Sequence, residues 1–210
     1  MKCKIKVEIL EIPFINLICR HILSSMTKTN FSSFPTLQTQ HLYLRRIELY
    51  DDNEILELRS NPQVNKFLER AVAITLEDAQ TFIRKIITGV ENGEWFYWAI
   101  TLKDENKLIG TICLWNIIKE KSLAEIGYEL HPAHQGKGLM QEAINAIIDF
   151  GFNEIQLETI TAFPIKENKK SIQVLLRNNF KEDINNEFRT EETPDDYIIY
   201  FLAKTKTNSV

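Results

Sequence analysis

Cysteine is scarce in this chain, which has three cysteines in 210 residues. Cys3, Cys19 and Cys113 lie far apart, are odd in number and show no Cys-x-x-Cys spacing. Neither a disulfide framework nor a cysteine zinc site is therefore indicated, and a reducing cytoplasm is the expected location. His131 and His134 have no carboxylate or thiol at ligand spacing beside them, so they are interpreted as loop histidines and no metal site is expected.

An excess of basic residues is also absent. The chain has 25 Lys and Arg against 29 Asp and Glu, a formal net charge of -4. Nonspecific nucleic-acid binding requires a basic surface, so no direct nucleic-acid partner is expected. The apolar stretch from Ile9 to Leu23 contains Glu11 and Arg20 and is too short to cross a bilayer, so neither a membrane span nor a signal sequence is expected.

Internal repeats and low-complexity linkers are missing too, and the length is sufficient for one domain with one substantial core. Residues 1 to 30 differ from the remainder and carry no motif. Met26 and the polar residues after it resemble an alternative translation start, although an additional helix or strand docked on the surface is the other interpretation. We expect an N-terminal extension over residues 1–30 that is not part of the fold, followed by one domain over residues 31–206.

Regular apolar patterning begins at Phe34 and predicts a mixed α/β domain. Strands are expected near residues 42–47, 95–102, 107–115, 123–130, 155–163, 180–188 and 197–203. Helices are expected before Asn61, from Thr75 to about Gly89, over 139–150 and over 171–177. Asp51 or Asp52 is expected to cap the first helix, and Thr75 with Asp78 to form a capping box on the second.

A turn with two glycines separates the expected strand 123–130 from the helix that follows it. Its sequence, from His134 to Met140, is His-Gln-Gly-Lys-Gly-Leu-Met. Closely spaced glycines let the backbone approach a ligand, and the N–H groups that begin a helix bind a pyrophosphate well. The turn fits neither a Walker loop, because Lys137 is followed by Gly138, nor a dinucleotide fingerprint, because Gln141 occupies the position of the third glycine. A simple connecting turn is the alternative.

Further segments form a linked pattern with this turn. They are Phe34–Arg45, with Leu42-Tyr43-Leu44-Arg45 at its end, Leu108–Ile112, Ala124–Pro132, Asn168–Ser171 and Asn178–Phe180. Together they resemble the GNAT N-acetyltransferase superfamily, specifically its ribosomal-protein N-terminal acetyltransferase (Rim-like) branch, over about Phe34 to Lys204. The family turn is Gln/Arg-x-x-Gly-x-Gly/Ala. Gln135 and Gly138 match it, whereas Met140 does not and is expected to point into the core.

The resemblance implies the GNAT acyl-CoA N-acyltransferase fold, a central, mostly antiparallel twisted sheet with splayed central strands, flanked by helices. It also implies acetyl-CoA as cosubstrate, no metal, and an acceptor that is a protein N-terminal α-amine or a small amine, attacked directly in a ternary complex. A monomer or a homodimer fits this function. The implied acetyl-CoA contacts are Tyr128, Leu130, Gln135, Gly136, Lys137, Gly138, Leu139, Met140, Asn168 and Ser171.

Acetyl transfer to an amine needs a base for the amine proton and stabilisation of the departing thiolate. Glu125 is the expected base, with Glu129 second, and outward-facing surface charges are the other interpretation of both. The helix position where many family members carry a tyrosine is Leu175, so the resemblance assigns the hydrogen bond to the CoA sulfur to Ser171. The other interpretation of Ser171 is a helix-capping or helix-surface serine. A catalytically silent acyl-CoA-binding sensor on the same fold is the alternative function. The failed nucleotide motifs disfavour an unrelated nucleotide-binding regulator.

Overall fold

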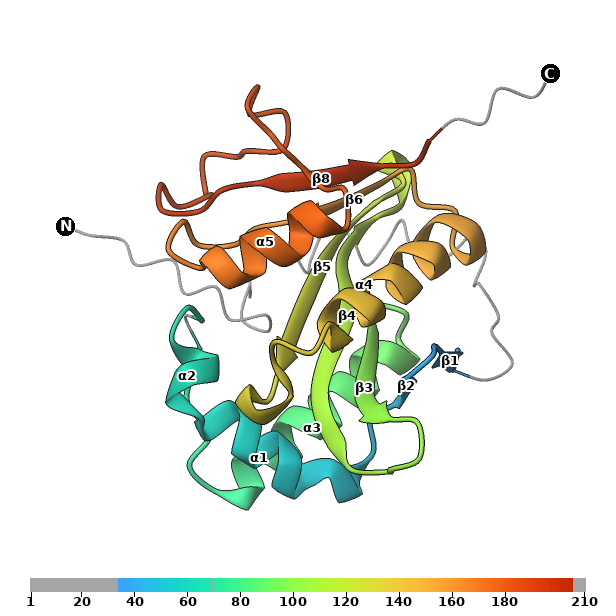
Figure 1. Ribbon diagram of the computed structural model, residues 1–210, viewed down its shortest axis with the longest axis vertical. Coiled ribbons are helices and arrows are strands. Elements are labelled where there is room, and N and C mark those ends of the chain that lie inside the picture. Colours follow the sequence, from blue (N-terminus) through green and yellow to red (C-terminus); the bar gives the residue numbers. More distant parts are fainter. Residues whose placement is uncertain (1–33, 69, 206–210) are drawn as a thin grey trace.

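An eight-stranded sheet forms the centre of the fold (Figure 1). The computed structural model describes residues 34–68 and 70–205, so the expected N-terminal extension lies outside the described residues. The strands are β1 (Leu37–Gln38), β2 (Leu42–Arg46), β3 (Phe96–Leu102), β4 (Leu108–Ile118), β5 (Leu123–Leu130), β6 (Thr159–Ala162), β7 (Lys181–Glu182) and β8 (Tyr200–Ala203). Their order across the sheet is β1-β2-β3-β4-β5-β6-β8-β7, and every neighbouring pair is antiparallel except β5 with β6. The expected mixed α/β fold with a mostly antiparallel sheet is confirmed.

Helices cover both faces of the sheet and create two apolar cores. The helices are α1 (Asp52–Ser60), α2 (Pro62–Asn65), α3 (Leu76–Glu91), α4 (Leu139–Asp149) and α5 (Lys169–Arg177). Buried residues of α4 and α5 form one core with the sheet, and buried residues of α1 and α3 form the other. Among the described residues, no helix combines the length and the apolar character needed to cross a membrane.

Strand β5 contributes to both faces of the sheet because its side chains alternate. Ala124, Ile126 and Leu130 belong to the core under α4 and α5. Glu125 and Glu129 therefore lie on the opposite face, where α1 and α3 pack. Strands β3 and β4, which follow one another in the chain, form an antiparallel pair.

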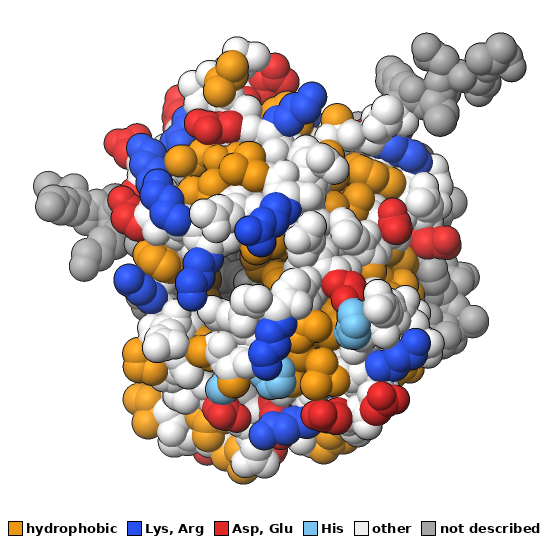
Figure 2. Space-filling model, in the orientation of Figure 1, with side chains coloured by type: hydrophobic (Ala, Val, Ile, Leu, Met, Phe, Trp, Pro, Cys, Tyr) orange, Lys and Arg blue, Asp and Glu red, His pale blue; other side chains and the backbone are white. Residues whose placement is uncertain are grey.

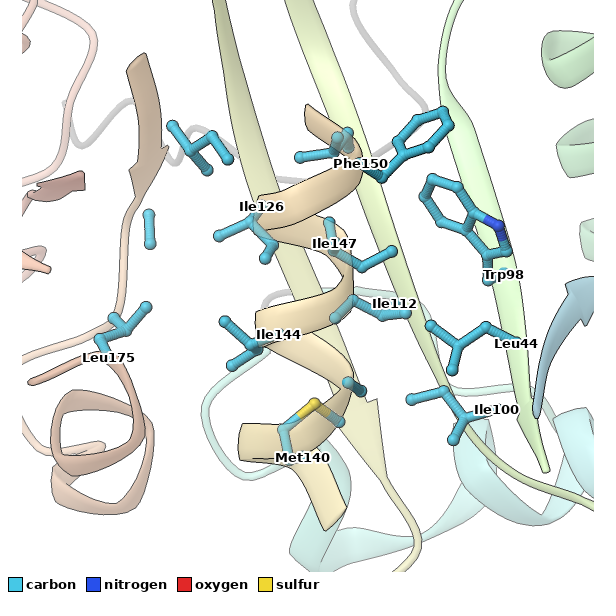
Figure 3. Close-up of a cluster of buried hydrophobic side chains, with 14 of the residues drawn as sticks. Leu44, Trp98, Ile100, Ile112, Ile126, Met140, Ile144, Ile147, Phe150 and Leu175 are labelled. Carbon is cyan, nitrogen blue, oxygen red and sulfur yellow. The ribbon is translucent and has the colours of Figure 1, made fainter. Parts of the chain in front are cut away.

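Helix α4 packs its apolar face across the sheet (Figure 3). Met140, Ile144 and Ile147 are buried in the same core as Trp98 and Ile112. The expectation that Met140 points inward is thus confirmed, and its side chain does not occupy the ligand side of the turn. The helix does not stop at Gly151 as expected but runs into a π-helical segment, Phe150–Glu154.

The two expected helix caps have different outcomes. Thr75 and Asp78 form the capping box of α3, as predicted. Asp51 stands at the N-cap position of α1 but makes no capping hydrogen bond through its side chain, and Asp52 is the first residue of the helix. The carboxylate of Asp51 is buried and paired with Arg45 at 2.6 Å, and it also accepts the N–H of Glu48. The Asp51 carboxylate thus pairs with Arg45 and completes the capping box of the 3-10 turn Leu49–Asp51 instead of capping α1.

Two expected strands are much shorter in the structure. The strand expected at 155–163 begins only at Thr159, because the π-helical segment precedes it and Gln156 has a left-handed φ of 57°. The strand expected at 180–188 is confined to Lys181–Glu182, because the Asp183 carboxylate accepts the N–H groups of Glu187 and Phe188 and turns the chain. Asn179, with φ 62°, follows the end of α5 in the left-handed conformation common at helix ends.

Candidate active site

The central strands β5 and β6 separate after a short paired segment. Parallel pairing joins Leu123 to Thr159, Ala124 to Ile160 and Glu125 to Thr161. Beyond Glu125, β5 continues to Leu130 with β4 as its only strand partner among the described residues, while β6 ends at Ala162 beside β8. We call this point of separation the fork. It confirms the expected splayed strands, and it leaves one backbone edge of β5 open to an extended ligand.

The glycine turn, residues 135–140, lies at the far end of this open edge. Gly136 and Gly138 have φ of 77° and 79°, and a Cβ added to either would meet nothing within 4 Å. Gly138 is the N-cap of α4 and offers no side-chain acceptor to the first N–H groups of the helix. Open space in front of uncapped N–H groups fits an anion such as a diphosphate.

Side chains around the turn hold it against its neighbours. The Gln135 amide donates to the Leu130 carbonyl at 2.9 Å and accepts from Lys170 of α5 at 3.3 Å. Gln135 therefore links β5, the turn and α5, which leaves its backbone rather than its side chain to contact a ligand. Figure 2 shows a hollow between α5 and this turn with Lys and Arg side chains at its rim. Lys137 and Lys170 are both exposed.

The first turn of α4 is held from the other side by Glu142. Its carboxylate accepts the backbone N–H of His41 at 2.7 Å, lies 2.9 Å from the ring Nδ1 of His41, and accepts the hydroxyl of Thr39. These contacts fix the start of α4 against the turn between β1 and β2. Sequence reasoning did not single out this cluster.

Ser171 and Asn168 lie at the start of α5, but the structure reverses one interpretation. Asn168 is the N-cap, and its side chain accepts the Ser171 N–H at 3.2 Å. The capping interpretation of Ser171 is therefore wrong. Its hydroxyl instead lies 2.8 Å from the hydroxyl of Tyr128 on β5. Leu175 is fully buried in the core.

Glu125 stands at the fork, as the last residue of β5 that pairs with β6. Burial raises the pKa of its carboxyl to about 8, and a hydrogen bond to Asn116 acts in the opposite direction. Asn116 was not anticipated. It has a left-handed φ of 48° within the irregular register of β4, a feature that a one-residue pattern does not reveal.

Glu129 lies on the same face as Glu125 but is already paired. Arg70 lies 2.7 Å from its carboxylate, and Thr111 donates to it at 3.3 Å. Burial alone would raise the pKa of Glu129, but the charges of Arg70 and Arg59 and the hydrogen bonds outweigh it and lower the pKa. Glu129 is thus a carboxylate whose charged form is stabilised by its partners, and Arg70 is a site neighbour that the sequence did not reveal.

The chain matches the acetyltransferase (GNAT) domain family over residues 41–181. It belongs to the GNAT acetyltransferase family. The uncharacterized N-acetyltransferase YoaA of Bacillus subtilis (strain 168) is 30% identical over 175 residues, which cover 82% of this chain and 99% of that protein. The ribosomal-protein-serine acetyltransferase of Escherichia coli (strain K12) is 39% identical over 79 residues, 36% of this chain and 42% of that protein.

Among solved structures, the ribosomal-protein-S5-alanine acetyltransferase of Vibrio fischeri has a TM-score of 0.68 at 25% identity, covering 80% of this chain and 96% of that chain. The expected GNAT membership is therefore confirmed, and these relatives make the expected Rim-like branch plausible. This GNAT protein is an acetyl-CoA-dependent N-acetyltransferase, and the turn and the fork fit a diphosphate and an extended arm. In the part of the chain that the structure describes, no group of three or more His, Cys, Asp or Glu is placed to hold a metal ion.

Proposed function

We propose that this acetyltransferase modifies a protein N-terminal α-amine by direct attack in a ternary complex, with Glu125 as the base and Ser171 as the hydrogen-bond donor to the CoA sulfur. One observation carries the proposal. At the fork, Glu125 faces the α1 and α3 side of the sheet, while the Tyr128 and Ser171 hydroxyls meet on the α4 and α5 side. A proton acceptor and a thiolate stabiliser on opposite faces suit an amine and a thioester that approach from opposite faces.

The cosubstrate would be held by backbone more than by side chains. The N–H groups around Gly136 and Gly138 would bind the diphosphate, with the exposed Lys137 and Lys170 beside it. The open edge of β5, from Ile126 to Leu130, would bind the pantetheine arm. Acetyl-CoA supplies the activated acetyl group.

Acetyl transfer then requires four linked changes. The amine nitrogen forms a bond to the carbonyl carbon, and Glu125 takes the proton that the amine loses. Backbone N–H groups near Tyr128 to Leu130 donate to the carbonyl oxygen as it gains negative charge. The C–S bond breaks, its electron pair goes to sulfur, and the Ser171 hydroxyl donates to the resulting thiolate.

The acidity of Glu125 supports an α-amine as the acceptor. Its pKa of about 8 is close to that of an α-amine, ~8, whereas a lysine amine has a pKa of ~10.4 and needs a stronger base. Proteins similar to this chain carry names of ribosomal-protein acetyltransferases, which act on protein acceptors.

The test is thiol release from acetyl-CoA with a matched panel of acceptors. The panel contains lysine-free peptides with a free N-terminus, the same peptides with a blocked N-terminus, blocked peptides with one lysine, polyamines and amino acids. We expect release only with free N-termini. Equal or faster release with a polyamine or a lysine side chain would overturn the choice of acceptor.

A further inference from the structure

The Tyr128 side chain extends from β5 to the first turn of α5. It lies on β5 opposite Ile112 of β4 and packs against the core under α4 and α5. Its hydroxyl lies 2.8 Å from the Ser171 hydroxyl and 3.4 Å from the Ser171 carbonyl. Two hydroxyls from residues 43 positions apart in the chain thus form a contact between β5 and α5.

The direction of the hydrogen bond between Tyr128 and Ser171 determines whether the Ser171 hydroxyl has a hydrogen left to donate to the CoA sulfur. A serine hydroxyl has a single hydrogen. If Ser171 donates that hydrogen to Tyr128, none is left for a sulfur atom. If Tyr128 donates instead, the Ser171 hydrogen is free to point into the fork.

The 2.8 Å contact permits either hydroxyl to donate, and two observations fit Tyr128 as the donor. Burial raises the pKa of Tyr128 to about 12, and the hydrogen bond to Ser171 lowers it only in part, so the phenol keeps its proton throughout the neutral range. The backbone of Ser171 is fixed because its N–H is bound by the Asn168 side chain. The Tyr128 O–H also lies within donating distance of the Ser171 carbonyl, at 3.4 Å, and the contact to the Ser171 hydroxyl, at 2.8 Å, is the shorter of the two.

We propose that Tyr128 is a positioning residue for acetyl transfer, because its O–H donates to Ser171 and so directs the Ser171 hydrogen toward the CoA sulfur. This inference rests on the sulfur contact of Ser171 in the proposed function. No proton leaves Tyr128. The C–S electron pair ends on sulfur, the amine proton goes to Glu125, and the thiolate is stabilised by a hydrogen bond until solvent protonates it.

Binding without turnover tests the inference directly. The affinities for CoA and for desulfo-CoA, which lacks the sulfur, are measured by calorimetry at pH 9 in the wild type, Tyr128→Phe, Ser171→Ala and the double variant. A hydrogen bond to a charged group is worth enough for about a tenfold preference for CoA in the wild type. Tyr128→Phe should reduce that preference to the level of Ser171→Ala while leaving desulfo-CoA affinity within about twofold.

Turnover measurements distinguish a positioning role of Tyr128 from a role in packing alone. Tyr128→Phe should lower kcat by about tenfold with little change in the KM for acetyl-CoA, and the double variant should be no slower than Ser171→Ala. Tyr97→Phe is the matched control, because it removes another buried hydroxyl, one bonded to Thr111 at 2.9 Å outside the fork. It should leave kcat and the sulfur preference unchanged.

The possible failures differ from one another. Ser171→Ala could remove the preference for CoA over desulfo-CoA while Tyr128→Phe retains it. That result would overturn the role of Tyr128 and leave the sulfur contact of Ser171 intact. No effect of Ser171→Ala on the preference overturns both. Tyr128→Phe could instead bind CoA and desulfo-CoA more tightly by the same factor, with kcat unchanged. The hydroxyl pair would then serve only to hold β5 against α5, which would also overturn the inference.

Discussion

Two carboxylates on one strand show how surroundings set the role of a residue. Glu125 and Glu129 share a face of β5, but burial raises the pKa of Glu125, whereas Arg70 and its neighbours hold the pKa of Glu129 below its ordinary value. A base must be able to exchange its proton near the working pH. Glu129 cannot do so without breaking its pairing with Arg70, so Glu125 is the better candidate of the two.

Replacing Glu125 by Gln should lower kcat by about a hundredfold and leave CoA affinity nearly unchanged, because the amide keeps the shape but cannot accept a proton. The wild-type rate is measured with an acceptor amine of low pKa, which is uncharged over the whole pH range of the assay. That rate should rise with pH and level off above about 8, following the pKa of Glu125. A pH-rate profile of both proteins checks this. An identical acidic limb in the variant would place the base elsewhere.

Glu125 also makes stability depend on pH in a direction unusual for a carboxylate. Its folded-state pKa, about 8, lies above the unfolded value of about 4.3, so the folded state retains a proton that the unfolded state releases. Its contribution is fully present below pH ~4.3, is lost progressively as the pH rises to about 8, and is constant above that. The melting temperature of Glu125→Gln relative to wild type should therefore rise between pH 5 and 8. A constant difference over that range would contradict the pKa assignment.

At the level of elements, the sequence predicted best where a motif and a periodic pattern coincide. Helix α4, its glycine turn and the capping box at Thr75 follow from local rules and were anticipated. The short strands β6 and β7 were not, because a π-helical segment and the Asp183 carboxylate interrupt apolar runs that look continuous. The same holds for the candidate site. Its glycine turn is recognisable as a local motif, whereas only the tertiary fold brings Arg70 to Glu129.

The start of α5 allows capping and chemistry to be tested separately. Asn168→Ala removes the N-cap and should lower the unfolding free energy by about 1 kcal/mol. Ser171→Ala should leave the melting temperature nearly unchanged and lower kcat, because the hydroxyl faces Tyr128 rather than the helix backbone. Thermal melts and turnover on the same samples check both. Full specific activity of Ser171→Ala per folded molecule would remove the serine from the mechanism.

The glycine turn has a matched control at the end of α3. Gly138 and Gly93 both have positive φ, 79° and 71°, and both face open space. An alanine at either site should cost roughly 1–2 kcal/mol of stability through left-handed strain. Only Gly138→Ala, whose methyl group would enter the proposed diphosphate space, should weaken CoA binding, by on the order of tenfold. Equal CoA affinities in the two variants would mean that the turn is only a connection.

At the level of the whole molecule, the boundary of the domain is still a prediction. A chain that starts at Met26 should melt at the temperature of the full chain and bind CoA with the same affinity, because residues 1 to 25 carry no motif and precede the first family-like segment. Parallel thermal melts and calorimetric titrations test this. A clear loss of stability in the shorter chain would show that the N-terminal segment contributes to the fold.

The fork also interrupts the strand pairing across the middle of the sheet. Within residues 34–68 and 70–205, three residue pairs join β5 to β6, and β8 and β7 connect to β5 in the sheet through β6. An acetyl-CoA arm bound along the open edge of β5 would act as a substitute for the missing strand and supply backbone hydrogen bonds that the chain does not make for itself. The cosubstrate would then be a stabiliser as well as a reactant, raising the unfolding free energy with the logarithm of its concentration. Resistance to heat and to proteolysis would in that case follow the acetyl-CoA supply of the cell.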